Sequence, residues 1–145
     1  MQDMTLNMRQ KLKKMEVIHE GYRRFPYKDT TGHITIGIGY NLTDRGISEE
    51  WIEKQFNDDI SFFHQQLEKE FEWFSSLNEP RQVALIDMCF MGFKKLLTFK
   101  KMFHHLSHHN FKIAAKEILN SKWAMQVGDR AHTIAKMIEL GEFLI

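Results

Sequence analysis

With 145 residues, 43% of them hydrophobic and 27% charged, the chain can bury a normal core as one domain or two small lobes, which excludes a disordered protein. The formal net charge is only +1, and the single Cys89 excludes an internal disulfide and favours a buried thiol. No secretory signal precedes the first predicted helix, and no apolar run reaches the ~18 residues of a membrane span. We therefore expect a protein made in the cytosol, with no membrane anchor of its own.

The first predicted elements are a helix and a β-hairpin. Thr5 is a plausible N-cap for a helix that runs to about Glu20, with apolar residues at helical spacing. Pro26 ends any helical tendency. Residues 27–29 and 34–38 then flank the turn Thr-Thr-Gly-His, a pattern that is typical of a hairpin.

The second arm of this hairpin, in the segment TGHITIGIGY, has one face almost without side chains. Isoleucines occupy one set of alternate positions and can be buried, whereas Thr35, Gly37 and Gly39 occupy the other set. Glycine inside a strand costs backbone entropy and packs nothing. Such a face would let a flat, bulky ligand such as a polysaccharide lie directly against the backbone. A β-bulge or a tight contact with a helix would need the same glycines.

A long helix is predicted next. Ser48, followed by two glutamates, is typical of a helix start, and apolar residues recur every three or four positions as far as Phe74. A helix of some two dozen residues is longer than one small lobe usually needs, so we expect it to bridge two lobes. Residues 75–80 break it, and Pro80 suits the first turn of the following helix.

The rest of the chain is predicted to be helical. The segment from Arg81 to about Met91 is apolar nearly all round, which is typical of a central buried helix. Shorter helices are expected over residues 99–106 and 111–120, around Trp123, and over 129–139, with plausible caps at Thr98, Asn110 and Asp129.

Two carboxylates and a threonine lie on consecutive predicted elements at the start of the chain. Glu20 ends the first helix, Asp29 ends the first arm of the hairpin, and Thr35 stands on the second arm. A compact arrangement could bring all three to one cleft. Two carboxylates in different settings are the usual requirement for cleaving a glycosidic bond. Apolar neighbours at positions 17 and 18 could keep a proton on Glu20, while an exposed Asp29 stays ionised.

Written as Glu20-Gly21-x5-Tyr27-x-Asp29-x2-Gly32-x2-Thr35-Ile36-Gly37-x-Gly39, this segment resembles the active-site signature of the phage-type lysozymes, glycoside hydrolase family 24, which includes the lysozymes of the T-even phages. In that family a Glu, an Asp nine residues on and a Thr six residues further form the catalytic set, and this chain keeps both spacings. The stretches EEWIEKQFNDDI, RQVALIDMCFMGF and NSKWAMQVGDRAHTI are similar to the family's inter-lobe helix, central buried helix and closing segment.

The resemblance implies an α+β fold that is mainly α. A single lysozyme-like domain would span residues 1–145, with a small α/β lobe carrying the hairpin at about 15–50. A long helix at about 49–74 would join it to a helical lobe at about 78–145, on which the first helix packs. The family's substrate cleft lies between the two lobes.

The function implied by the resemblance is that of an endolysin, a muramidase that needs no cofactor or metal. It would hydrolyse the β-1,4 bond between N-acetylmuramic acid and N-acetylglucosamine in peptidoglycan. Glu20 would be the general acid, Asp29 would activate water or stabilise the cationic transition state, and Thr35 would help to hold that water. Substrate-binding positions would be the two strand glycines, an arginine that faces the catalytic Glu in the family, and three positions that line the sugar cleft: Gly37, Gly39, Arg130, Asn41, Phe90 and Glu117.

Two other classes of function stay open. A lytic transglycosylase needs a catalytic Glu but no water-activating Asp, so Asp29 and Thr35 argue against that reaction. A wall-binding protein without activity would be expected to have lost Glu20 or Asp29, and neither is lost. By family analogy, a phage or prophage would encode the enzyme for host lysis. The enzyme, a monomer, would wait in the host cytoplasm until a pore released it to the periplasm and cell wall.

Histidines gather in the run HHLSHH. His104 and His108, like His105 and His109, have the i,i+4 spacing that can clamp a divalent metal on a helix. The run has no Cys, Asp or Glu to complete a ligand set. A solvated helix face is the alternative.

The two halves of the chain differ in charge. Residues 81–145 hold ten Lys and Arg against five Asp and Glu. This half could associate weakly with an anionic cell envelope, although a solvated helical face accounts for the same charges. Nucleic-acid binding is not expected, because the chain has no recognised module for it and a net charge near zero.

Overall fold

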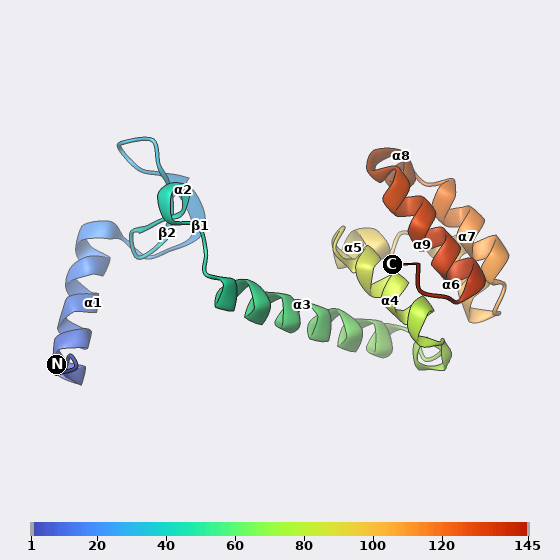
Figure 1. The fold of residues 1–145 in the computed structure, drawn as a ribbon, viewed down its shortest axis with the longest axis horizontal. Coiled ribbons are helices and arrows are strands. Elements are labelled where there is room, and N and C mark those ends of the chain that lie inside the picture. Colours follow the sequence, from blue (N-terminus) through green and yellow to red (C-terminus); the bar gives the residue numbers. More distant parts are fainter. Residues whose placement is uncertain (1, 145) are drawn as a thin grey trace. The chain divides into compact units, whose positions relative to one another are not determined.

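The computed structural model describes residues 2–144, and the chain divides into two compact units between Lys54 and Gln55. The first unit contains α1 (Leu6–Glu20), β1 (Arg23–Lys28), β2 (Ile34–Gly37), β3 (Tyr40–Asn41), α2 (Leu42–Arg45) and the start of α3 (Glu49–Glu70) (Figure 1). The second unit contains the rest of α3, the 3-10 helix η1 (Phe74–Ser76), α4 (Glu79–Cys89), α5 (Phe93–Leu96), α6 (Lys100–Ser107), α7 (Phe111–Leu119), α8 (Lys122–Val127) and α9 (Asp129–Leu140). The predicted class, α+β and mainly α, is confirmed.

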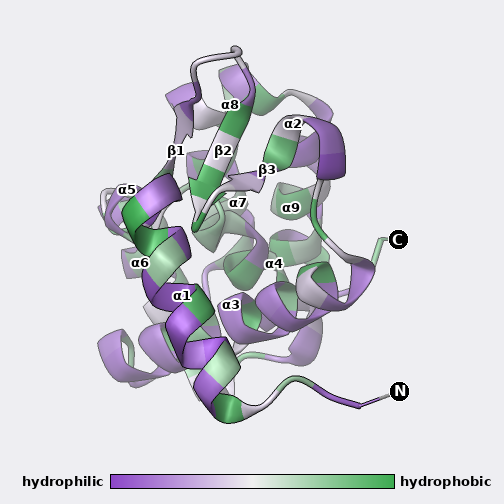
Figure 2. Ribbon diagram, turned by 90° about the vertical axis from the view of Figure 1, so that its left-hand side faces the viewer, coloured by the Kyte–Doolittle hydropathy of each residue, from purple (hydrophilic) through white to green (hydrophobic). Residues whose placement is uncertain are grey.

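Helix α1 has the predicted bounds. The Thr5 hydroxyl accepts a hydrogen bond from the Met8 amide at 3.2 Å, and Gly21, with a φ of +88°, ends the helix by donating its amide to the Val17 carbonyl. No residue of α1 is buried. Hydrophobic and hydrophilic residues lie side by side along it (Figure 2).

The predicted hairpin is present and gains a third strand. In the antiparallel sheet β1-β2-β3, Tyr27 pairs with Thr35, and Thr35 in turn pairs with Asn41 of β3. The two faces of β2 differ from the prediction. Ile34, Ile36 and Ile38 are only half-buried, whereas Thr35 on the glycine face is 4% exposed. Thr35 therefore occupies the middle of the sheet.

Two further differences concern helix ends. Helix α3 ends at Glu70, earlier than the predicted Phe74, and α2 and α5 are short helices that the pattern did not indicate. Phe99 rather than Thr98 caps α6, and Gly128 rather than Asp129 caps α9, while Asn110 stands at the N-cap of α7 without a side-chain hydrogen bond. The Thr98 hydroxyl instead donates to the Lys95 carbonyl at 2.6 Å.

The core of the second unit is built on α4, as predicted. Ala84, Leu85, Met88 and Cys89 of α4 are buried, and α9 packs against both α4 and α7. Burial raises the pKa of the Cys89 thiol to about 12, so the thiol stays protonated and unreactive at neutral pH. None of the helices within residues 2–144 is long and apolar enough to cross a membrane.

Truncating this core should unfold the second unit more easily. Leu85→Ala is expected to lower the free energy of unfolding by about 2–5 kcal/mol, because it leaves a cavity at a fully buried position. Val83→Ala, on the same helix but 40% exposed, is the control and should cost less than about 1 kcal/mol. Urea denaturation measures both, and equal losses would contradict the assignment of α4 as the centre of the core.

Candidate active site

Glu20 is the last residue of α1. Its side chain is exposed, and its backbone carbonyl accepts a hydrogen bond from the Tyr27 hydroxyl of β1 at 3.3 Å. Of the two apolar neighbours expected to cover Glu20, Ile18 is 80% exposed and Val17 is half-buried. The Tyr27 contact ties the end of the helix to the first strand, so the position of Glu20 depends on the hairpin.

Gly39 holds Glu20 from the other side. A Cβ atom at Gly39 would lie 2.8 Å from Cγ and 2.9 Å from Cβ of Glu20, closer than real side chains come. Gly39 also has a φ of +67°, which favours glycine. Gly39 lies in the turn after β2, and its missing side chain makes room for the helix end, the tight contact that was the alternative to a ligand surface. Nothing lies within 4 Å of a Cβ at Gly37, and Gly37 lines a hollow of about 880 Å³ in the first unit.

Asp29 is fixed by the turn that follows it. Its Oδ1 atom accepts three hydrogen bonds: from the Thr31 amide at 2.9 Å, the Thr31 hydroxyl at 2.8 Å and the His33 amide at 2.9 Å. The Asp29 amide donates to the His33 carbonyl at 2.9 Å, which closes the turn. Oδ2 lies 3.7 Å from Nδ1 of His33. An aspartate bonded to the amides two and four residues ahead is typical of a tight turn.

These bonds favour the charged form of Asp29. The Thr31 hydroxyl, followed by the His33 amide, holds the pKa of the Asp29 carboxyl below its usual value, against a smaller opposing effect of desolvation. Asp29 is therefore ionised at neutral pH. The first unit thus presents two carboxylates in different surroundings, one at a helix end and one fixed and charged in a turn.

Removing the Thr31 hydroxyl should raise the pKa of Asp29. Because that pKa is lower in the folded than in the unfolded chain, its contribution to stability is present above the unfolded value and is lost as pH falls through the folded value. Thr31→Ala should therefore reduce the part of the free energy of unfolding that is lost between neutral and acidic pH. Carbon NMR titration of the Asp29 carboxyl measures the shift, with Thr30→Ala as the control. An unchanged pKa in Thr31→Ala would contradict the assignment.

Thr35 connects the turn to the sheet. Its hydroxyl donates to the His33 carbonyl at 3.3 Å, and its backbone pairs with both neighbouring strands. The proton of Thr35 is thus committed within the turn that holds Asp29, while the lone pairs of its oxygen can still accept a hydrogen bond.

Three site residues were missed from the sequence: Thr31, His33 and Asp44. Nε2 of His33 lies 3.4 Å from Oδ2 of Asp44, and the same oxygen accepts from Nδ2 of Asn41 at 2.9 Å. Oδ1 of Asn41 accepts from the Asp44 amide at 3.1 Å and caps α2. Asn41, predicted as a sugar contact, therefore has both ends of its amide engaged. An Asn three residues before an Asp is a capping signal that sequence reasoning could have used.

The remaining predicted site residues belong to the second unit. Phe90, 47% exposed, packs its ring against Phe63 at 5.1 Å between centroids and against Phe56 at 6.4 Å. Arg130 donates from Nε to Oδ1 of Asp87 at 2.9 Å and from a terminal nitrogen to the Asp87 carbonyl at 3.0 Å. Its guanidinium is thus held by a partner 43 residues away.

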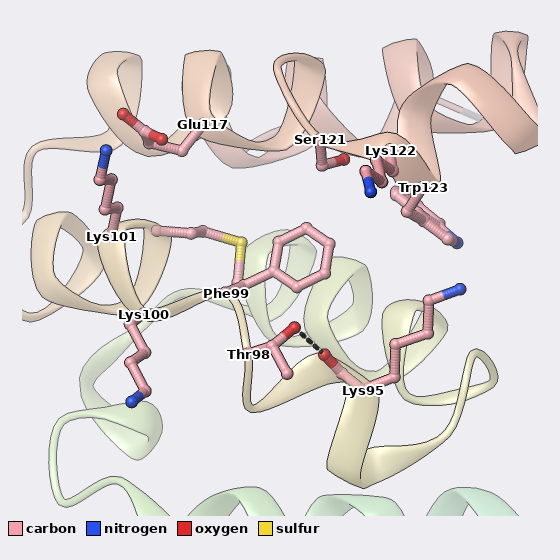
Figure 3. Close-up of a pocket in the computed structure, with 10 residues that line it drawn as sticks. Lys95, Thr98, Phe99, Lys100, Lys101, Glu117, Ser121, Lys122 and Trp123 are labelled. Carbon is pink, nitrogen blue, oxygen red and sulfur yellow. Dashed lines mark hydrogen bonds between the residues drawn. The ribbon is translucent and has the colours of Figure 1, made fainter.

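Glu117 is half-buried on α7 and lines a separate hollow, which is shown in Figure 3. Within residues 2–144, no group of three or more His, Cys, Asp and Glu side chains could hold a metal ion. The rings of His104 and His108 lie 4.7 Å apart between centroids and are tilted by 49°, and Nδ1 of His108 lies 2.9 Å from the His104 carbonyl.

Comparison with known proteins gives consistent matches. A family model described as phage lysozyme matches residues 17–136, which is most of the chain. Two relatives come from Dictyostelium discoideum: "Probable T4-type lysozyme 1" is 30% identical over 160 aligned residues, and "Probable T4-type lysozyme 2" is 28% identical over the same length. In each case the alignment covers 90% of this chain and 94% of the relative.

Proposed function

Since the chain belongs to the phage lysozyme family and is thus a lysozyme-like peptidoglycan hydrolase, we propose that it is a muramidase. The bond cleaved would be the β-1,4 bond between N-acetylmuramic acid and N-acetylglucosamine. The observation that carries this proposal is the contact of Glu20 with Gly39, in the turn after β2, within the same sheet whose preceding turn fixes an ionised Asp29. These features support a pair of carboxyl groups in different surroundings, one at the end of a helix and one ionised in a turn of the sheet.

In the proposed mechanism, Glu20 donates its proton to the oxygen of the leaving sugar. The charge of Asp29 stabilises the cationic transition state, or its Oδ2 atom orients a water molecule, because the three hydrogen bonds of the turn all go to Oδ1. The oxygen of Thr35 accepts a hydrogen bond from that water. In this role Glu20 acts as a general acid, so it enters the reaction with its proton in place.

We propose six residues as contacts for the glycan strand. Gly37 and Gly39 would offer backbone groups to sugar hydroxyls. Phe90 would offer the exposed part of its ring to a sugar face. The other proposed contacts are Asn41, Glu117 and Arg130. Asn41 and Arg130 would act from positions already fixed by Asp44 and Asp87, so little side-chain entropy would be lost on binding.

The cellular role is a further part of the proposal. A single lysozyme-like domain, with a hairpin lobe at about 15–50, a long helix at about 49–74 and a helical lobe at about 78–145, would act as a monomer. As an endolysin it would degrade the cell wall after release from the host cytoplasm, with cytolytic and antimicrobial effect.

Mass spectrometry of muropeptides released from purified peptidoglycan tests the proposed bond and reaction. Products with reducing N-acetylmuramic acid ends are expected. Anhydromuramic ends would instead indicate a lytic transglycosylase, and reducing N-acetylglucosamine ends would indicate cleavage of the other glycosidic bond. The absence of products would leave a wall-binding protein.

A further inference from the structure

The hollow beside Glu117 lies wholly within the second unit and has a volume of about 520 Å³. Its walls come from the end of α5, the start of α6, α7 and α8. The ring of Phe99 stands in the middle; Lys101 and Glu117 lie at one end, and Lys95 and Lys122 lie at the other (Figure 3). Lys100 points away from the ring.

The three lysines that face this hollow carry charge without a carboxylate partner. Among the ion pairs of residues 2–144, none within 4.0 Å involves Lys95, Lys101 or Lys122. Lys95 has only a long contact of 3.4 Å with the side-chain oxygen of Gln126. Three ammonium groups around one concave surface, against the single Glu117, create a positive potential that attracts an anion.

The hydroxyl groups of the hollow have no proton to offer a ligand. The Thr98 hydroxyl donates to the Lys95 carbonyl, and the Ser121 hydroxyl donates to the Ile118 carbonyl, each at 2.6 Å. An oxyanion would therefore depend on the lysines alone. The Glu117 carboxylate, by contrast, accepts hydrogen bonds and suits a ligand that also carries hydroxyl groups.

Aromatic rings give the hollow an apolar floor. Phe99 is half-buried and meets the buried Trp123 edge to face, with 6.4 Å between centroids, and Met102, which also lines the hollow, is fully buried. Such a surface can cover the C–H face of a sugar ring. The hollow thus has two cations at one end, an acceptor beside a third cation at the other, and an aromatic floor between them.

We propose that this hollow binds a phosphorylated sugar. The phosphate would lie between Lys95 and Lys122, where its charge of about −1.5 to −2 is furthest from Glu117. The sugar ring would cover Phe99, and its hydroxyls would donate to Glu117 beside Lys101. The same contacts would serve a free sugar phosphate or a phosphorylated glycan of the cell envelope. Glu117 is the one residue that this site shares with the proposed peptidoglycan surface, and phosphate binding requires no hydrolysis.

Titration calorimetry and amide NMR on the full chain test the site, with glucose 6-phosphate, inorganic phosphate and glucose as probes. Glucose 6-phosphate should bind about tenfold or more tightly than either fragment, with shifts confined to residues 95–102 and 117–123. Addition of salt should weaken it. Failure of glucose 6-phosphate to saturate the protein, or affinity no better than that of inorganic phosphate, would overturn the proposal. Such a failure leaves muropeptide release, measured separately, unaffected.

Paired variants separate this site from general surface charge. Lys95→Gln with Lys122→Gln should weaken glucose 6-phosphate about tenfold or more. The matched control is Lys11→Gln with Lys13→Gln, on α1, where lysines line a hollow that has no aromatic residue. Glu117→Gln should reduce the preference for glucose 6-phosphate over inorganic phosphate, a change that mere unfolding would not produce. Equal losses in the control pair would overturn the proposal.

A further binding experiment distinguishes a polymeric ligand from a free sugar phosphate. A purified phosphorylated envelope glycan, before and after phosphatase treatment, is compared with free glucose 6-phosphate. Tight binding of the untreated glycan supports a polymer ligand, and binding of the free sugar alone supports a metabolite. Equal binding of treated and untreated glycan, without binding of the free sugar, would overturn the role of phosphate.

Discussion

Glu20→Gln is expected to lower the rate of muropeptide release by about 10²–10⁴-fold while the protein stays folded. Gln has nearly the shape of Glu but cannot donate a proton to the leaving sugar oxygen. The substitution leaves the backbone carbonyl of Glu20, which accepts from Tyr27, in place. The exposed side chain at this helix end contributes little to the core, so the loss would report chemistry rather than stability.

Glu16→Gln is the matched control for this change. Glu16 lies one turn earlier on α1, so the same substitution removes the same charge from the helix and leaves Glu20 in place. The rate of muropeptide release by Glu16→Gln should stay within about twofold of the wild type, since substitutions away from the site have small effects. Circular dichroism melts would verify folding of both variants. Full activity of Glu20→Gln would remove Glu20 from the role of general acid.

The long helix shows what periodicity can and cannot predict. The Ser48 signal predicted its start, and the Ser48 hydroxyl indeed accepts from the Trp51 amide. Apolar spacing predicted most of its length. The helix ends at Glu70, four residues before the predicted Phe74. Phe71 stacks on Phe103 at 4.3 Å between centroids, and Phe74 is buried in a 3-10 turn. Their spacing resembles a continuing helix, but their burial is set by distant residues that the local pattern does not contain.

The candidate site divides in the same way. The positions of Glu20, Asp29 and Thr35 within their elements could be predicted, because each follows from a local boundary or alternation. The partner of Arg130 could not, since Asp87 lies on another helix far away in the chain. The turn contacts of Asp29 lie between these cases. Their residues are adjacent, but which atoms meet depends on backbone angles that the sequence does not specify.

The glycines of β2 and of the following turn show that the same sequence pattern can have two structural causes. A gap on a strand face is the same sequence signal whether a ligand or the protein itself fills it. At Gly39 the protein fills it, with the Glu20 side chain. At Gly37 the space stays open. Only three-dimensional neighbours separate the two, and they lead to opposite expectations for an added methyl group.

Gly39→Ala should therefore damage both stability and activity. An alanine with a φ of +67° costs about 1–2 kcal/mol in backbone conformation. Its methyl group would also collide with Cβ and Cγ of Glu20, which lie too close to the helix backbone to move freely. A displacement of about 1 Å at a catalytic group can cost about 10²-fold in rate. Muropeptide release, measured well below the melting temperature, should fall by that order.

Gly46→Ala separates the collision from the backbone strain. Gly46 lies in the same unit with a φ of +59°, and a Cβ atom there meets nothing within 4 Å. This variant should lose a similar free energy of unfolding in urea but keep its rate. If both variants kept their rates, the close contact between Glu20 and Gly39 would have no part in positioning the acid. If both lost rate equally, the loss would follow from the strain or instability of the hairpin unit. Only a selective loss in Gly39→Ala ties the missing side chain at Gly39 to the placement of Glu20.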